Sequence, residues 1–202
     1  MNFAFLASCL LFCAVIYHAI NRSKSIEENS TKAFWQKEQQ ANFVRKKSLD
    51  NLDYITIPEQ ILHLSPQSSS EKIKECLKEL TELSETPIVN LTGISNTDLK
   101  LAYGTANITI LSQYDFQYTS MVRILQKLAE ELVSLNEKEL AVQVLEFSVS
   151  TRTDISKTYY LLASLYAEAG TPEKKDFLIQ QAERINSIMK DSIVRTLQAS
   201  GQ

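Results

Sequence analysis

Histidine and glycine, on which many active sites depend, are scarce in this sequence. Of its two histidines, His18 lies in the apolar N-terminal segment and His63 in the polar remainder, so we expect no histidine pair that binds zinc and no histidine-based triad. The four glycines complete neither a phosphate-binding GxxxxGK[ST] or GxGxxG motif nor the GxSxG motif of serine hydrolases. We therefore expect no catalytic residue, no metal and no cofactor. An enzyme with an unrecognised site remains an alternative.

Cysteine is equally sparse, and its placement indicates a reducing environment. Cys9 and Cys13 lie in the apolar N-terminal segment, and Cys76 is the only thiol in the rest of the chain. A single cysteine cannot form an intramolecular disulfide framework, so nothing indicates an oxidising compartment. Cys76 falls on the apolar face of an expected helix, and we expect it to be buried and unreactive.

An excess of positive charge is also absent. Lys and Arg number 21 against 24 Asp and Glu, which gives a net charge of −3. This balance argues against nucleic acid as a partner. Basic residues cluster only beside the apolar N-terminal segment, where attraction to anionic lipid headgroups explains them.

The longest uncharged run covers residues 3–20 and predicts a transmembrane helix. These 18 residues contain no Lys, Arg, Asp or Glu, and a helix of that length spans roughly 27 Å, close to the ~30 Å of a hydrocarbon core. A cleaved signal peptide is the alternative. No basic residue precedes the run, however, and small residues do not occupy the positions that cleavage prefers. We therefore predict a retained signal anchor at 1–20.

The basic residues after this run predict the orientation. Arg22 and Lys24 follow it directly, and Arg45, Lys46 and Lys47 come soon afterwards. Since positive charge stays inside, the N-terminus should lie outside the cell and the C-terminal domain in the cytoplasm, at the cell membrane. The inverted topology is the alternative. Only in that case would the four N-x-[ST] sequons matter, at Asn21, Asn29, Asn90 and Asn107.

Residues 21–111 are predicted to form a stalk and a connecting region. A polar juxtamembrane stalk covers 21–50. The region 51–111 begins with an extended strap, read in the run from Leu49 to Leu64, that packs through Leu52, Ile55 and Ile57. An amphipathic helix follows, with a capping box formed by Ser68 and Glu71, and it ends before Pro87.

A turn-rich connector, residues 90–104, completes this region. It contains a predicted short helix, Thr97–Tyr103, with Asn96 as the N-terminal cap and Gly104 as the C-terminal cap. Gly93, Asn96, Thr97 and Asp98 present polar groups there. Turn and cap chemistry explains them, and a functional use stays open.

The region 112–202 is predicted to be helical, starting at a capping box of Ser112 and Asp115. A helix follows with the apolar stripe Tyr118, Met121, Val122, Leu125, Leu128 and Leu132. Two helical hairpins between about Val122 and Asn186 then align with a period of 34 residues. The aligned pairs are Leu125 with Tyr159, Leu128 with Leu162, Ala129 with Ala163, Leu132 with Tyr166, Asn136 with Gly170, Leu145 with Ile179, and Ser148 with Ala182. Helices cross closely only where small residues meet large ones, and the turn needs a residue that tolerates positive φ.

This stretch resembles the tetratricopeptide repeat family. Leu162-Ala163-x-x-Tyr166 with Gly170 and Ala182 is the better copy, and Ala141 supplies a small residue in the first copy. The sequence departs from the family at Lys175 and in lacking a closing proline. The segment Ser187–Leu197, with Ile188, Met189, Ile193, Val194 and Leu197, is expected to cap the array. The predicted fold is all-α: a transmembrane helix plus a tetratricopeptide-like hairpin array with a C-terminal capping helix.

The resemblance implies a binding function rather than catalysis. In such arrays the first helix of each hairpin lines the groove, which by position gives Arg123, Gln126, Glu130, Lys157, Tyr160, Ser164 and Glu168. Their mixed charge suggests a polar peptide or protein partner, and solvated helix faces explain the same residues equally well. We expect a membrane-anchored adaptor or assembly factor. A structural subunit of a larger membrane complex is the alternative.

Overall fold

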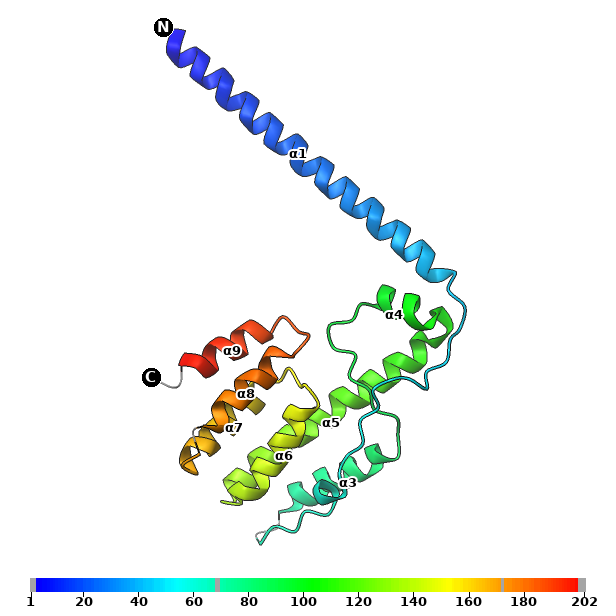
Figure 1. Ribbon diagram of the computed structural model, residues 1–202, viewed down its shortest axis with the longest axis vertical. Coiled ribbons are helices and arrows are strands. Elements are labelled where there is room, and N and C mark those ends of the chain that lie inside the picture. Colours follow the sequence, from blue (N-terminus) through cyan, green and yellow to red (C-terminus); the bar gives the residue numbers. More distant parts are fainter. Residues whose placement is uncertain (1–2, 68–69, 172, 200–202) are drawn as a thin grey trace. The chain divides into compact units, whose positions relative to one another are not determined.

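The chain is all-α, as predicted. The computed structural model describes residues 3–67, 70–171 and 173–199, without the side chains of residues 3–10, 14, 19, 25, 26 and 28, and within this part it contains no strand (Figure 1). The helices are α1 (Phe3–Asn42), α2 (Glu59–Leu62), α3 (Glu71–Ser84), α4 (Asn96–Tyr103), the 3-10 turn η1 (Thr105–Asn107), α5 (Ile108–Ser134), α6 (Lys138–Ser150), α7 (Ser156–Glu168), α8 (Lys174–Glu183) and α9 (Lys190–Ala199). They form two compact units, residues 1–47 with 95–108, and residues 48–94 with 109–202.

The first unit consists of α1, α4 and η1, and polar contacts join α4 to the end of α1. Glu38 on α1 forms an ion pair with Lys100 and accepts a hydrogen bond from the hydroxyl of Thr97 at 2.6 Å. Lys37 pairs with Asp98 at 2.6 Å. These pairs fix the face that α4 presents to α1.

Gly104 ends α4, as predicted, with φ of 88°. A Cβ at this position would lie 2.3 Å from the backbone oxygen of Arg45, so both its conformation and its surroundings require glycine. The predicted N-terminal cap was wrong by one residue. Ser95, rather than Asn96, accepts the N–H of Asp98, and both residue types cap helices well.

The predicted membrane segment lies within α1. In the described part of the chain, no helix is both long enough and apolar enough to cross a membrane. The side chains of residues 3–10, 14 and 19 lie outside the described residues. They make up much of the segment 3–20, and the anchor stays a prediction.

The second unit contains one hydrophobic core, to which the strap, α3 and α5–α9 contribute. Helices α6, α7, α8 and α9 pack against their neighbours in chain order (Figure 1). The predicted stripe on α5 is buried throughout. The strap contributes Ile57, Ile61 and Leu64 to this core, and its Tyr54 forms an isolated bridge with Val89. Ile55 is half-buried against the same core.

Two predicted caps differ from the structure. Ser68 lies outside the described residues, and α3 is capped by Ser70, which accepts the N–H of Ile73 at 3.2 Å. The capping box of Ser112 and Asp115 was wrong because α5 already begins at Ile108. Asp115 instead accepts the backbone N–H of Leu91 at 3.1 Å and so ties the connector to α5.

The two hairpin turns have the same backbone geometry, 34 positions apart. Asn136 and Gly170 have φ of 63° and 70°, the positive values that their alignment predicted. The N–H of the next residue bonds back to the aligned Leu132 and Tyr166 carbonyls, at 2.9 and 3.0 Å. This pattern is a helix C-terminal motif that satisfies otherwise unpaired carbonyls.

The starts of α7 and α9 also correspond, again 34 positions apart. Thr153 accepts the N–H of Ile155 at 3.2 Å, and Ser187 accepts that of Met189 at 3.3 Å. Ile188, assigned to an apolar helix face, is 96% exposed because it lies in the turn before α9. The helix itself buries Ile193 and Leu197.

Candidate functional site

The predicted groove residues of α5 have different roles in the structure. Arg123 is exposed. Gln126 is buried: its Nε2 donates to Glu130 at 2.7 Å, and its Oε1 accepts a hydrogen bond from the hydroxyl of Thr158 at 2.8 Å. Gln126 is therefore a link between α5 and α7 whose polar groups are already used.

The predicted groove residues of α7 divide in the same way. Lys157 is exposed and lies 4.0 Å from Glu130 across the two helices, and Tyr160 is half-buried. Ser164 donates to the carbonyl of Leu161 in its own helix. Glu168 pairs with Lys138 of α6 at 2.7 Å. The structure thus brings Gln126, Glu130 and Lys157 together, whereas Glu168 is engaged with α6.

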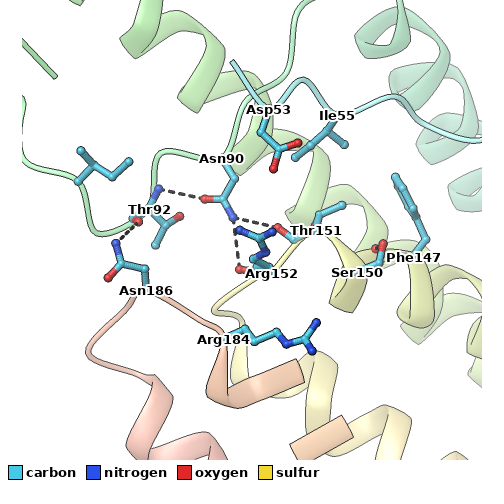
Figure 2. A pocket seen from close by; sticks show the side chains of 11 residues that line it. Asp53, Ile55, Asn90, Thr92, Phe147, Ser150, Thr151, Arg152, Arg184 and Asn186 are labelled. Carbon is cyan, nitrogen blue, oxygen red and sulfur yellow. Dashed lines mark hydrogen bonds between the residues drawn. The ribbon is translucent and has the colours of Figure 1, made fainter. Parts of the chain in front are cut away.

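A polar cavity of about 320 Å³ lies elsewhere in the second unit, where α6 and α8 end (Figure 2). The strap, the connector and the two helix ends contribute its walls. We call it the arginine cavity. Its lining residues are Asp53, Ile55, Asn90, Thr92, Ile94, Phe147, Ser150, Thr151, Arg152, Arg184 and Asn186.

Amide side chains hold the frame of the arginine cavity. Asn90 donates through Nδ2 to the carbonyl of Thr151 at 2.9 Å and accepts the N–H of Thr92 at 2.9 Å. Asn186 donates to the carbonyl of Thr92 at 3.2 Å (Figure 2). The connector is thereby joined to the ends of both α6 and α8, which fixes the cavity walls.

Gly93 allows this close approach. Its φ is 78°, and a Cβ at this position would lie 2.0 Å from the backbone oxygen of Asn186. Both the backbone conformation and the lack of space exclude a side chain here. Gly93, expected to present a polar group, therefore has a structural role: it lets the connector approach Asn186 beside the arginine cavity.

The charged groups of the arginine cavity are Arg152, Arg184 and Asp53. Within the part of the chain that the structure describes, neither guanidinium group has an acidic side chain at ion-pair distance. Arg152 has φ of 61°, an unusual value for a residue other than Gly, Asn or Asp. Both arginines are exposed, and their guanidinium groups, without an acidic partner among the described residues, suit a carboxylate or another oxyanion.

A second cavity, of about 420 Å³, is mainly apolar and lies over α6, α7 and α8. Phe177 lines it and is 56% exposed, and Lys174 lies 5.0 Å from the centre of the Tyr166 ring. Burial, then the hydrogen bond to Glu146, raises the pKa of Tyr166. This tyrosine stays neutral and structural at physiological pH.

Among its described residues, the second unit has neither a metal cluster nor an accessible thiol. In residues 3–67, 70–171 and 173–199, no three His, Cys, Asp or Glu side chains gather in a way that would hold a metal ion. Cys76 is fully buried, and burial raises the pKa of its thiol. A thiol in this state is a poor nucleophile.

The sequence had pointed to the connector but not to the arginines. Arg152 and Arg184 occupy helix ends, where a basic residue is common because it complements the helix dipole. No signal in the sequence marked them, because the positive φ of Arg152 is visible only in the structure. In the comparisons with known proteins, no family model, no curated protein and no solved structure matches this chain.

Proposed function

We propose that this chain is a membrane-anchored adaptor that binds a protein or peptide partner on a helical-repeat surface. The observation that carries the proposal is the repeated turn at Asn136 and Gly170, with its equal hydrogen bonds and positive φ values. A recurring hairpin stacks helices at a constant offset and creates an extended binding surface. The same period, 34 residues, is that of tetratricopeptide repeats.

The exposed surface on α5 and α7 supports a binding role. Arg123 and Lys157 are exposed one repeat apart, and the carboxylate of Glu130 on α5 lies 4.0 Å from Lys157 on α7. We call these three residues the repeat face. Gln126 fixes the spacing of its two helices from below. The repeat face is polar and preformed, which suits a hydrogen-bonding peptide.

The membrane anchor in this proposal rests on the sequence. Residues 3–20 carry no charged side chain, and the basic residues that follow favour a cytoplasmic domain. Helix α1 continues from Asn21 to Asn42, and α4 packs on it from Lys37 onward, which leaves residues 21–36, a length of roughly 24 Å at the usual rise per residue. That length would serve as a stalk between the bilayer and the first unit's α4.

A photo-crosslinking experiment in intact cells tests the proposal. A photoreactive amino acid replaces Arg123 or Lys157 on the repeat face, or the 79% exposed Lys78 of α3 as a control. We expect one discrete crosslinked product from the first two positions and none from Lys78. Products from all three positions would instead favour a structural subunit enclosed in a larger complex.

Protease protection of the C-terminal domain in the same cells tests the topology. The anchor and its orientation predict a membrane-bound chain whose domain survives protease added from outside. Digestion of the domain, or its glycosylation, would establish the inverted topology. Release of the whole chain into the soluble fraction would refute the anchor.

A further inference from the structure

We propose that the arginine cavity is a second binding site, which takes a carboxylate from an acidic segment of the partner. This inference rests on the proposed function, in that the ligand is part of a protein. The arginine cavity is a different surface from the repeat face. The proposed ligand group is an acidic side chain with an apolar neighbour.

The charge of the lining carries the first step. Arg152 and Arg184 oppose a single carboxylate, Asp53. Figure 2 shows these three residues and Asn90 arranged around the same hollow. A planar guanidinium group binds carboxylate with two parallel hydrogen bonds, and neither arginine spends this capacity on an acidic side chain of the described residues.

The backbone at Arg152 carries the second step. Asn136, Arg152 and Gly170 all follow helix ends with φ between 61° and 70°. Asn136 and Gly170 are of the types that accept this conformation readily, whereas an arginine there is strained. Helix-dipole complementarity alone does not explain the choice, because a basic residue in the last turn of α6 would provide it without strain. Arg152 is the one of these residues that lines the cavity.

The shape and the walls carry the third step. The volume of about 320 Å³ is at the lower end of ligand sites, which suits one or two side chains of a peptide rather than a large cofactor. Ile55, Ile94 and Phe147 form apolar parts of the lining. The amides of Asn90 and Asn186 already bond to backbone carbonyls, so they hold the walls and leave the guanidinium groups to the ligand.

Peptide binding to the full chain in detergent micelles tests the inference. The probe is a fluorescein-labelled peptide of repeated Ser-Glu-Leu triplets, and its matched control has Gln in place of Glu. Fluorescence anisotropy measures the affinity of the unmodified chain and of the variants Arg152→Asn, Arg184→Gln and Arg123→Gln. The Asn substitution keeps a residue that accepts positive φ, and Arg123→Gln removes a charge from the repeat face only.

We expect the acidic peptide to bind and the Gln peptide to bind at least tenfold more weakly. Each of Arg152→Asn and Arg184→Gln should weaken the acidic peptide by about tenfold or more, the usual loss of a charge-assisted hydrogen bond. Arg123→Gln should leave this affinity unchanged. The thermal unfolding temperature of Arg152→Asn should not fall, which excludes misfolding as the cause.

Three results would overturn the inference. They are no binding of the acidic peptide, equal binding by the arginine variants, or binding of inorganic phosphate that depends on both arginines while the peptide does not bind. The last result would assign the cavity to a free anion. Crosslinking at Arg123 and Lys157 reports on the adaptor function separately, so it can succeed even when the arginine cavity fails.

Discussion

Substitution of Gly93 by alanine should destabilise the second unit much more than the same change at Gly170. Both glycines have positive φ, 78° and 70°, so both variants carry the same conformational penalty. Their surroundings differ. A Cβ at Gly93 would lie 2.0 Å from the backbone oxygen of Asn186, whereas no atom lies within 4 Å of a Cβ at Gly170. The pair separates steric exclusion from backbone preference.

The two magnitudes follow from these contacts. An alanine in the left-handed region costs about 1 kcal/mol, which is the expected loss for Gly170→Ala. At Gly93 the backbone of Asn186 must also move, and this breaks its 3.2 Å hydrogen bond to Thr92. That bond contributes about 1 kcal/mol, and repacking of the turn costs a similar amount. We expect a total near 3 kcal/mol for Gly93→Ala.

Urea unfolding of the full chain in micelles, followed by far-ultraviolet circular dichroism, measures both values. The single tryptophan, Trp35, lies on α1 in the first unit, so its fluorescence serves as an internal reference. The urea concentration at which the Trp35 fluorescence changes should be the same in the unmodified chain and in both variants. Equal losses for Gly93→Ala and Gly170→Ala would refute the close approach of the connector to Asn186.

Three further predictions concern single groups. Thr158→Val removes the donor to buried Gln126 and should lower the free energy of unfolding by about 1–3 kcal/mol, measured by the same urea titration, whereas Thr158→Ser should retain most of it. The hydrogen bonds from Lys100 and Thr97 hold the pKa of Glu38 below its usual range; their stabilisation is therefore complete above the pKa of an unfolded glutamate and is lost as the pH falls through the lowered value. Trp35 fluorescence should detect this acid loosening of the first unit, and Glu38→Gln should reduce its pH dependence. In a chain with Cys9 and Cys13 replaced by serine, the buried Cys76 should react with a thiol reagent only after unfolding; rapid reaction of the folded chain would contradict its burial.

The helices of the second unit could be predicted because apolar spacing determines which face is buried. The stripe that includes Leu125 and Leu128 needed only the helical period, and the structure buries both. The turn at Asn136 followed from its alignment with Gly170. Cap positions could be predicted only to within a residue, because neighbouring residues compete for the same role. Ser95 and Asn96 are both good caps, and only the folded connector decides between them.

The start of α5 could not be read from the sequence for a related reason. Ser112 and Asp115 have the spacing of a capping box, yet the helix begins at Ile108, directly after η1. Asp115 is used by a residue distant in sequence, Leu91, whose N–H it accepts. A local pattern cannot reveal that its key side chain has a tertiary partner, so the local interpretation was wrong.

The repeat face could be predicted only in part. The tetratricopeptide resemblance assigned Arg123, Gln126 and Lys157 to a groove surface, but it did not reveal which of them would be buried. Gln126 lies under the surface with its amide bonded on both sides. Because Gln126 is buried, the exposed groups of the repeat face are charged side chains. A partner of the kind we propose would therefore have to complement side chains that already neutralise one another at Lys157 and Glu130.

The arginine cavity has the opposite electrostatic character, and within the proposed function this difference would give the two surfaces different roles. Exposed charge pairs such as Lys157 and Glu130 contribute little net attraction, because each partner already satisfies the other in water. Arg152 and Arg184 have no such partner among the described residues, and one acid shares their cavity. Both arginines are themselves exposed, so a ligand carboxylate would gain there by pairing with groups that no acidic side chain of the described residues already occupies. Affinity for an acidic partner should therefore come chiefly from the cavity, while the repeat face contributes shape and orientation.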